Sequence, residues 1–262
     1  MRSLSSITPV LLLAAAAAGC SSTGSSDLGG NGRVAVRLST TPMTTSGSSL
    51  LTPGITVTLG SDVVIVDGVQ LVARKIKLQR ADGTCPTPVV EDAQGSGSDA
   101  DEGDTEECPN VRLGPMLLSP PLGEGVDGTF SVDLPAGSYH ELQMQIHKPT
   151  SSSKDAAFLA ANPGFAGTSI KVTGTFNGVP FVFTTSLTAE IEVPFLQDVV
   201  VVGGTTTSLT LQLDVRSWFK AQGGLALLNP GTLTQQDRQR VEQNIRASFH
   251  AFRDENGDGR QD

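Results

Sequence analysis

Apolar and polar residues alternate along much of the chain between residues 33 and 216. In RVAVRLS, which starts at residue 33, the apolar side chains fall on every second position, as on a half-buried strand. The same period recurs in ITVTLG, TFSVDLP, SYHELQMQIHK, TSIKVTGTF, VPFVFTTSLTAEIEVPF and TTSLTLQLDV. Asn177-Gly178 separates two of these segments and predicts a type I′ hairpin turn, because both turn residues need positive φ. Eight to ten strands at this spacing predict a mainly β protein built as an antiparallel sandwich.

One long segment, DVVIVDGVQLVARKIKLQRADG, changes the phase of its alternation. Its apolar positions are first odd-numbered (Val69, Leu71) and then even-numbered (Val72, Ile76, Leu78). A regular strand cannot bury both sets on one face, so the pattern predicts a bulge or kink between Ala73 and Lys75.

An amphipathic helix is predicted near the C-terminus. Thr234, followed three residues later by Asp237, is typical of a helix N-cap. Apolar residues then recur at helical spacing at Val241, Ile245, Phe249 and Phe252, whereas Arg238, Arg240, Glu242 and Arg246 occupy the opposite, solvated face. We expect this helix to pack its apolar stripe on the sandwich.

The segment DENGDGRQD after this helix resembles the start of a calcium-binding loop. Positions 1, 3, 5, 7 and 9 are Asp254, Asn256, Asp258, the carbonyl of Arg260 and Asp262, with Gly259 at the turn position 6. The sequence offers no acid for position 12, so the α-carboxylate of Asp262 or a neighbouring loop would supply that oxygen. The segment is either a weak calcium site or a polar tail after a helix that Gly257 ends.

The first residues predict export and lipid anchoring. Residues 1–19 contain a charged start and a short apolar run, which is typical of a cleaved signal peptide. AAAGC at its end resembles the lipobox of bacterial lipoproteins, and this resemblance implies lipidation of Cys20 and a membrane anchor made of acyl chains. The alternative is an ordinary secretory signal that happens to precede a cysteine. Residues 20–32 would form a flexible tether, and Ser21 favours the outer membrane, facing the periplasm or the cell surface.

The other two cysteines flank an acidic, low-complexity stretch. Eight acids lie between Cys85 and Cys108, and residues 86–107 are expected to form a disordered loop, with weak cation binding as the alternative. In an oxidising compartment a disulfide between these cysteines is expected, worth about 3 kcal/mol, with free thiols or a metal site as alternatives. Outside this loop 19 acids balance 18 bases, so the charge does not favour nucleic-acid binding.

The histidines and motifs do not favour catalysis. The segment SYHELQMQIHK places His140 with Leu142, Met144 and Ile146 on one face, opposite Tyr139 and His147. The two histidines therefore cannot share a metal ion or form a catalytic pair, and His140 is expected at the core margin. The sequence also contains no G-x-S-x-G or H-E-x-x-H motif.

We therefore expect a non-catalytic envelope protein that binds or scaffolds an unidentified envelope protein or glycan. Two alternatives stay open. One is a carbohydrate-binding module, although Trp218 and Tyr139 are the only Trp and Tyr in the chain. The other is a hydrolase whose site is assembled from distant segments.

Three segments resemble a family of exported bacterial lipoproteins that form a domain of unknown function. They are VVIVDGVQLVARKIKLQRADG, LPAGSYHELQMQI and VVGGTTTSLTLQLDVRSWF, and related chains often end in a helix and an aspartate-rich tail. The resemblance implies an immunoglobulin- or transthyretin-like sandwich. We expect this sandwich over residues 33–218, with residues 219–262 as helix and tail. The resemblance implies no activity.

Overall fold

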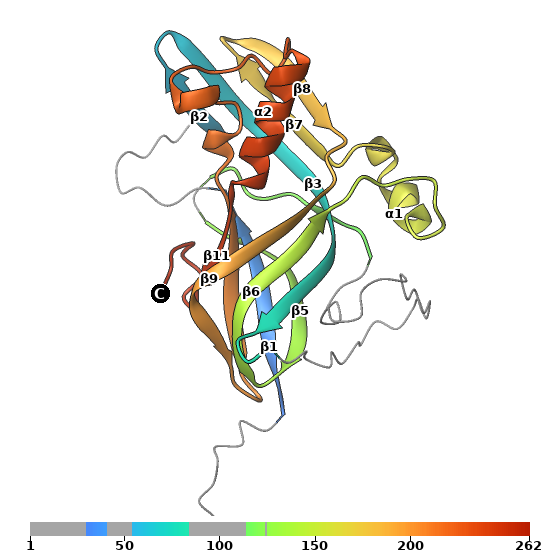
Figure 1. The fold of residues 1–262 in the computed structure, drawn as a ribbon, viewed down its shortest axis with the longest axis vertical. Helices are drawn as coiled ribbons and strands as arrows, with labels where there is room; N and C mark the ends of the chain where they lie inside the picture. Colours follow the sequence, from blue (N-terminus) through green and yellow to red (C-terminus); the bar gives the residue numbers. More distant parts are fainter. Residues whose placement is uncertain (1–29, 41–53, 84–113, 124) are drawn as a thin grey trace, which may run out of the picture.

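The computed structural model describes residues 30–40, 54–83, 114–123 and 125–262 (Figure 1). The predicted lipidation at Cys20, the disulfide between Cys85 and Cys108, and the acidic loop lie outside these residues. The last two residues of the predicted tether, Asn31 and Gly32, already belong to the first strand. No helix in the described part is long and apolar enough to cross a membrane.

Eleven strands of the described residues form two sheets. The four-stranded sheet has the order β11 (Phe249–Arg253), β10 (Thr206–Leu213), β1 (Asn31–Ser39) and β5 (Asp127–Pro135). The seven-stranded sheet has the order β8 (Val179–Thr185), β7 (Ile170–Phe176), β3 (Asp62–Arg80), β6 (Gly137–Ile146) and β9 (Ala189–Val201), and β2 (Ile55–Leu59) and β4 (Met116–Leu118) also pair with β3. This confirms the predicted mainly β, sandwich-like fold. All pairs are antiparallel except β1 with β10, which is parallel.

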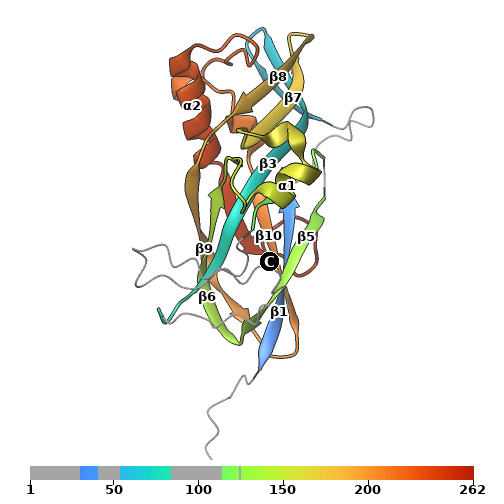
Figure 2. The ribbon, with the colours of Figure 1, turned by 90° about the vertical axis from the view of Figure 1, so that its right-hand side faces the viewer.

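The long strand β3 joins two parts of an elongated molecule (Figures 1 and 2). Its C-terminal half pairs with β6 in the part where the two sheets face each other. Its N-terminal half pairs with β7, and that end of the sheet is covered by α2 (Gln235–Arg246) and two short 3-10 turns, η2 (Val215–Ser217) and η3 (Gln222–Gly224). One continuous apolar core extends through both parts.

The predicted bulge in β3 is confirmed. The pairing register with β6 shifts between Arg74 and Lys77, and Lys75 adopts a left-handed φ of 51°. Leu71 therefore belongs to the main core, and Ile76 after the bulge does so too. Val72 points the other way and packs on Phe158 and Phe165 in a separate small cluster. This cluster lies under α1 (Ala156–Ala161) and the 3-10 turn η1 (Pro163–Phe165).

The hairpin and the helix cap are also confirmed. Asn177 and Gly178 have φ values of 49° and 79°, as a type I′ turn requires. Thr234 and Asp237 form a reciprocal capping box at the start of α2. Two residues of the predicted stripe, Val241 and Ile245, are fully buried.

The predicted length of the helix is wrong. The helix ends at Arg246, and Phe249 and Phe252 belong to β11, which pairs antiparallel with β10. The free edge of β10 offers unpaired backbone groups, and a strand satisfies them where a longer helix would not. Because β11 covers this edge, the C-terminal segment is part of the four-stranded sheet.

Candidate functional site

The loop after β11 closes around the carboxylate of Asp254, which is fully buried. Its Oδ2 accepts hydrogen bonds from Thr210 Oγ1 at 2.6 Å and from the Gly259 amide at 3.0 Å. Its Oδ1 accepts a bond from the Asp258 amide at 3.0 Å. The backbone amide of Asp254 donates to the Ser208 carbonyl at 3.0 Å. This one residue therefore fastens the loop to β10, an inner strand of the sheet.

The other predicted ligand residues are held by short-range bonds within the loop. The Asp258 amide also donates to Asn256 Oδ1 at 2.9 Å, so the side-chain oxygens of loop positions 1 and 3 converge on one amide hydrogen. The Arg260 amide donates to Asp258 Oδ1 at 2.9 Å. The Glu255 amide donates to Asp262 Oδ2. The loop thus surrounds its own amide groups with the oxygens that were predicted as ligands.

Two glycines allow this chain path. Gly257 and Gly259 have φ values of 71° and 77°, a left-handed conformation that side chains other than glycine rarely adopt. The guanidinium of Arg37 in β1 lies against Gly257, where a Cβ would collide with it. The alternative of a polar tail after a helix is therefore wrong, because the segment follows a strand and is folded onto the sandwich.

Calcium at this loop stays a prediction. Within the described ranges, no group of three or more His, Cys, Asp or Glu side chains is arranged to hold a metal ion. The loop also offers an amide oxygen of Asn256 and the carbonyl of Arg260, which calcium accepts as ligands. A bound cation would have to replace part of the amide hydrogen bonding around Asp254.

A buried hydrogen-bonded pair of a histidine and an aspartate at the start of α1 was not predicted from the sequence. Nε2 of His147 lies 2.8 Å from Oδ1 of Asp155, and both side chains are almost fully buried. Oδ2 of Asp155 accepts bonds from the Thr150 amide at 2.8 Å, from Thr150 Oγ1 at 3.2 Å and from Ser152 Oγ at 3.3 Å. The sequence signal was weak, because Asp155 lies in a Ser- and Ala-rich segment eight residues after the histidine.

The buried surroundings of this pair lower the pKa values of both His147 and Asp155. Burial lowers the pKa of the His147 imidazole, and the hydrogen bond to Asp155 opposes this only in part. Burial by itself disfavours the charged carboxylate of Asp155, but the bonds from Thr150 and His147 outweigh it and lower the pKa of Asp155.

This pair does not have the arrangement of a hydrolase triad. In a triad the nucleophilic hydroxyl bonds to the imidazole. Here the neighbouring hydroxyls of Thr150 and Ser152 bond to the carboxylate of Asp155. His140 is half-buried, as expected at the core margin, but its Nδ1 has no hydrogen-bond partner among the described residues. The pair of His147 and Asp155 therefore ties the segment around α1 to β6.

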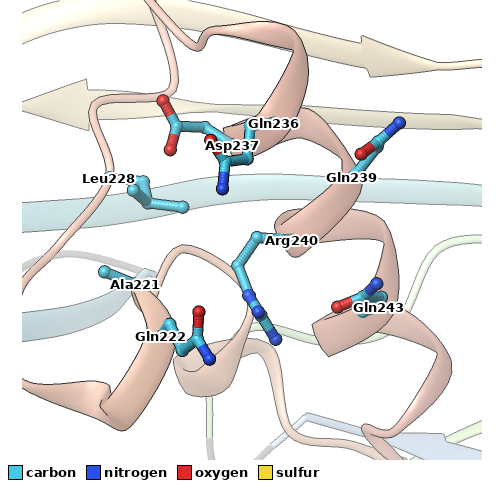
Figure 3. A pocket seen from close by; sticks show the side chains of 8 residues that line it. All are labelled: Ala221, Gln222, Leu228, Gln236, Asp237, Gln239, Arg240 and Gln243. Atoms are coloured by element: carbon cyan, nitrogen blue, oxygen red, sulfur yellow. The ribbon is translucent and has the colours of Figure 1, made fainter.

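A polar groove of about 280 Å³ runs beside α2, and we call it the α2 groove (Figure 3). The helix contributes one wall, formed by Gln236, Asp237, Gln239, Arg240 and Gln243. The opposite wall consists of Ala221, Gln222 and Leu228. In Figure 3, Arg240 extends from the helix toward the opposite wall and ends between Gln222 and Gln243. The sequence pattern placed Arg240 on a solvated helix face and did not reveal the second wall.

The second wall of the α2 groove is held rigidly against the helix. The Asn244 side chain of α2 donates to the carbonyls of Trp218 at 3.0 Å and Lys220 at 2.9 Å. Lys220 and Leu227 form an isolated bridge, and the Ala221 amide donates to the Ala226 carbonyl at 2.9 Å. Both walls are therefore held in place by their own hydrogen bonds.

The two large aromatic side chains considered for stacking on sugars are buried. Trp218 is fully buried and donates from Nε1 to Ser248 Oγ at 2.8 Å. Tyr139 is also fully buried, contrary to the predicted face, because the pairing of β6 with β9 shifts between Tyr139 and Glu141. Its hydroxyl donates to the Pro135 carbonyl at 2.8 Å. Neither ring is therefore exposed on the surface, where it could stack on a sugar.

Comparisons with known proteins add little to this description. No family model and no curated protein sequence matches the chain. One solved structure, MbnP from Methylosinus trichosporium, is similar over 77% of this chain and 82% of its own, at 10% sequence identity. The TM-score of 0.37 is too low for this likeness to carry an inference about fold or function.

Proposed function

We propose that this chain is a non-catalytic lipoprotein of the cell envelope whose sandwich domain binds a partner. The lipobox at Cys20 supports membrane attachment through lipid, with the outer membrane as the favoured location. The single observation that supports binding is the α2 groove, a concave polar surface with rigid walls and an arginine at its centre. The partner is an envelope protein or a glycan.

Support for a non-catalytic role comes from the arrangement around His147. The hydroxyls near this histidine bond to Asp155, so the imidazole does not receive a proton from either of them. The proposal of a hydrolase therefore has no geometric support at this pair. An aromatic sugar platform also lacks support, because Trp218 and Tyr139 are buried.

We also propose that calcium completes the C-terminal loop and stabilises its attachment to β10. The convergence of Asp254 Oδ1 and Asn256 Oδ1 on one amide supports this, because it brings two predicted ligand oxygens together. Extracellular calcium modules have a Kd of about 10⁻⁴ to 10⁻³ M. At 10 mM calcium such a site would add about 1.4 to 2.7 kcal/mol to the free energy of unfolding.

The calcium proposal is tested by urea unfolding of the mature protein in EDTA and in 10 mM calcium. Asp258→Ala should lose the calcium effect, since it removes the ligand at position 5, whereas 10 mM magnesium should give a smaller stabilisation. Equal unfolding midpoints of the wild type with and without calcium would refute it.

Membrane attachment and the disulfide are tested on protein from the native envelope. Mass spectrometry of the mature N-terminus should find acyl chains on Cys20, and Cys20→Ser should release the protein from the membrane fraction. An unmodified cysteine at the mature N-terminus would refute the lipoprotein proposal. Alkylation of both Cys85 and Cys108 in the native protein, without reductant, would refute the disulfide.

A further inference from the structure

We infer that the α2 groove binds a saccharide that carries a carboxylate, a sugar acid of the uronic type. This rests on the binding role proposed above and names the ligand class and the site. Arg240 would hold the carboxylate, and the glutamine amides would hold the hydroxyl groups.

Arg240 has the properties of an anion anchor. It is half-buried in the groove, and its guanidinium makes no hydrogen bond or ion pair within the described part of the chain. Asp237 lies three residues earlier on the helix, but its Oδ2 is engaged by the amide and hydroxyl of Thr234 in the capping box. A guanidinium offers a planar pair of N–H groups that matches both oxygens of a carboxylate. A carboxylate in the groove would therefore give Arg240 the partner that this chain does not supply.

The four glutamines favour a hydroxylated ligand over a plain anion. The side chains of Gln222, Gln236, Gln239 and Gln243 make no hydrogen bonds among the described residues. Each amide is both a donor and an acceptor, and a sugar hydroxyl has the same dual character. Phosphate and sulfate oxygens accept hydrogen bonds, so a site for these anions would need only donors, whereas these amides also offer acceptors. The side chain of Leu228 adds a small apolar surface that suits the C–H face of a sugar ring.

The size and rigidity of the groove suit a short saccharide. Its volume of about 280 Å³ lies just below the range of about 300 to 1,000 Å³ for small-molecule sites. One or two rings of a chain would occupy it, with the remainder in solvent. Because Asn244 holds the second wall against the helix, the backbone of the groove needs little ordering on binding, and the cost falls on the side chains of Arg240 and the glutamines.

The test is calorimetric titration of the mature protein with glucuronate, glucose, acetate and a polyuronate oligomer. Glucuronate should bind at least about 10-fold more tightly than glucose or acetate, because only glucuronate carries both the charge and the hydroxyls. Tighter binding of the oligomer than of the monomer would identify an envelope polymer as the source, and equal binding would identify a free sugar acid.

Variants locate the site. Arg240→Met keeps much of the side-chain volume and should weaken glucuronate binding about 10-fold or more, whereas Arg240→Lys should weaken it less. Arg246→Met is the matched control, because Arg246 is an exposed arginine on the same helix outside the groove, and it should leave binding unchanged. Thermal melts followed by Trp218 fluorescence establish that each variant is folded.

The following outcomes would overturn the inference. They are no heat with any of the four probes at tens of millimolar, acetate binding as tightly as glucuronate, or equal loss in the Arg240 and Arg246 variants. A calcium response without sugar-acid binding would overturn this inference alone. Sugar-acid binding without a calcium response would overturn only the calcium proposal.

Discussion

Replacing Asp254 with alanine should detach the C-terminal loop from the sandwich. The wild-type carboxylate is fully buried and accepts three hydrogen bonds, from Thr210 Oγ1 and from the amides of Asp258 and Gly259. Alanine supplies no acceptor at this fully buried position. The substitution therefore leaves hydrogen-bond donors without their acceptor in a part of the folded protein that is shielded from solvent.

The magnitude follows from which donors remain buried. Thr210 and Gly259 are buried, and a buried donor without a partner costs about 1 to 3 kcal/mol. The Asp258 amide keeps its bond to Asn256 Oδ1, and Asp258 is only half-buried, so the loss of its second acceptor costs less. We expect Asp254→Ala to lower the free energy of unfolding by about 3 to 4 kcal/mol, because the terms are not fully additive.

Urea unfolding in EDTA, followed by the fluorescence of Trp218, measures this effect. Trp218 is the single tryptophan of the chain and is fully buried, so it reports the core directly. Asp258→Ala is the matched control, because its carboxylate accepts from the exposed Arg260 and Asn256, and it should cost less than about 1 kcal/mol. Thr210→Val combined with Asp254→Ala should show a coupling of about 1 to 2 kcal/mol.

The reasoning would be refuted if Asp254→Ala and Asp258→Ala destabilised the protein equally and by less than 1 kcal/mol. That result would mean that the loop opens readily and that its hydrogen bonds contribute little to stability. It would also remove the support for calcium at this position.

Three further predictions concern ionisable and strained residues. Burial lowers the pKa of His147 below its ordinary 6.5, so the stability that the neutral imidazole confers is present above pH 6.5 and is lost as the pH falls below that value. The free energy of unfolding should therefore drop between pH 7 and 5, by at most about 1.4 kcal/mol per pH unit. His147→Gln should reduce this drop. Burial raises the pKa of Tyr139 above 10.0, so phenolate absorbance of the native protein should appear only above pH 10. Lys75→Gly should raise the free energy of unfolding by about 1 kcal/mol, because glycine adopts the φ of 51° without strain.

Two of these predictions have a control variant, and each has an outcome that would contradict it. His250→Gln changes an exposed histidine of β11 and is the control for the loss of an imidazole elsewhere. If His147→Gln left the pH dependence of the free energy of unfolding unchanged, the prediction for His147 would be contradicted. Tyr139 is the single tyrosine, so a native titration with its midpoint at or below 10 would contradict the second. Lys171→Gly in the regular strand β7 should destabilise, and a loss of stability in Lys75→Gly as well would contradict the third.

Several local features follow directly from the order of the residues. The phase change from Leu71 to Ile76 predicted the bulge, because a regular strand cannot bury an odd- and an even-numbered residue on the same face. Asn177 with Gly178 predicted the turn, and Thr234 with Asp237 predicted the helix start. In each case the bonding partners lie within a few residues or the pattern repeats along one strand.

Part of the candidate site could also be predicted. The spacing from Asp254 to Gly259 predicted a tight loop with a glycine at its turn, and the structure has both. The attachment of this loop to Thr210 could not be predicted, because the two residues are 44 positions apart. His147 with Asp155 and Arg240 with Gln222 were missed for a similar reason, since no periodic pattern connects them.

The sequence alone therefore determined most of the segments that form strands, where one strand bulges, and how the hairpin and helix begin, because these depend on short-range geometry and on periodic burial. The tertiary structure decided which strands are neighbours. It placed β10 between β1 and β11, and this converted the expected end of the helix, from Phe249 onward, into a strand. It also brought Arg240 to face Gln222 across a groove. The physical reason is that the segment that pairs with a strand edge, or that forms the second wall of a groove, is brought there by the path of the whole chain, and the local sequence does not contain that information.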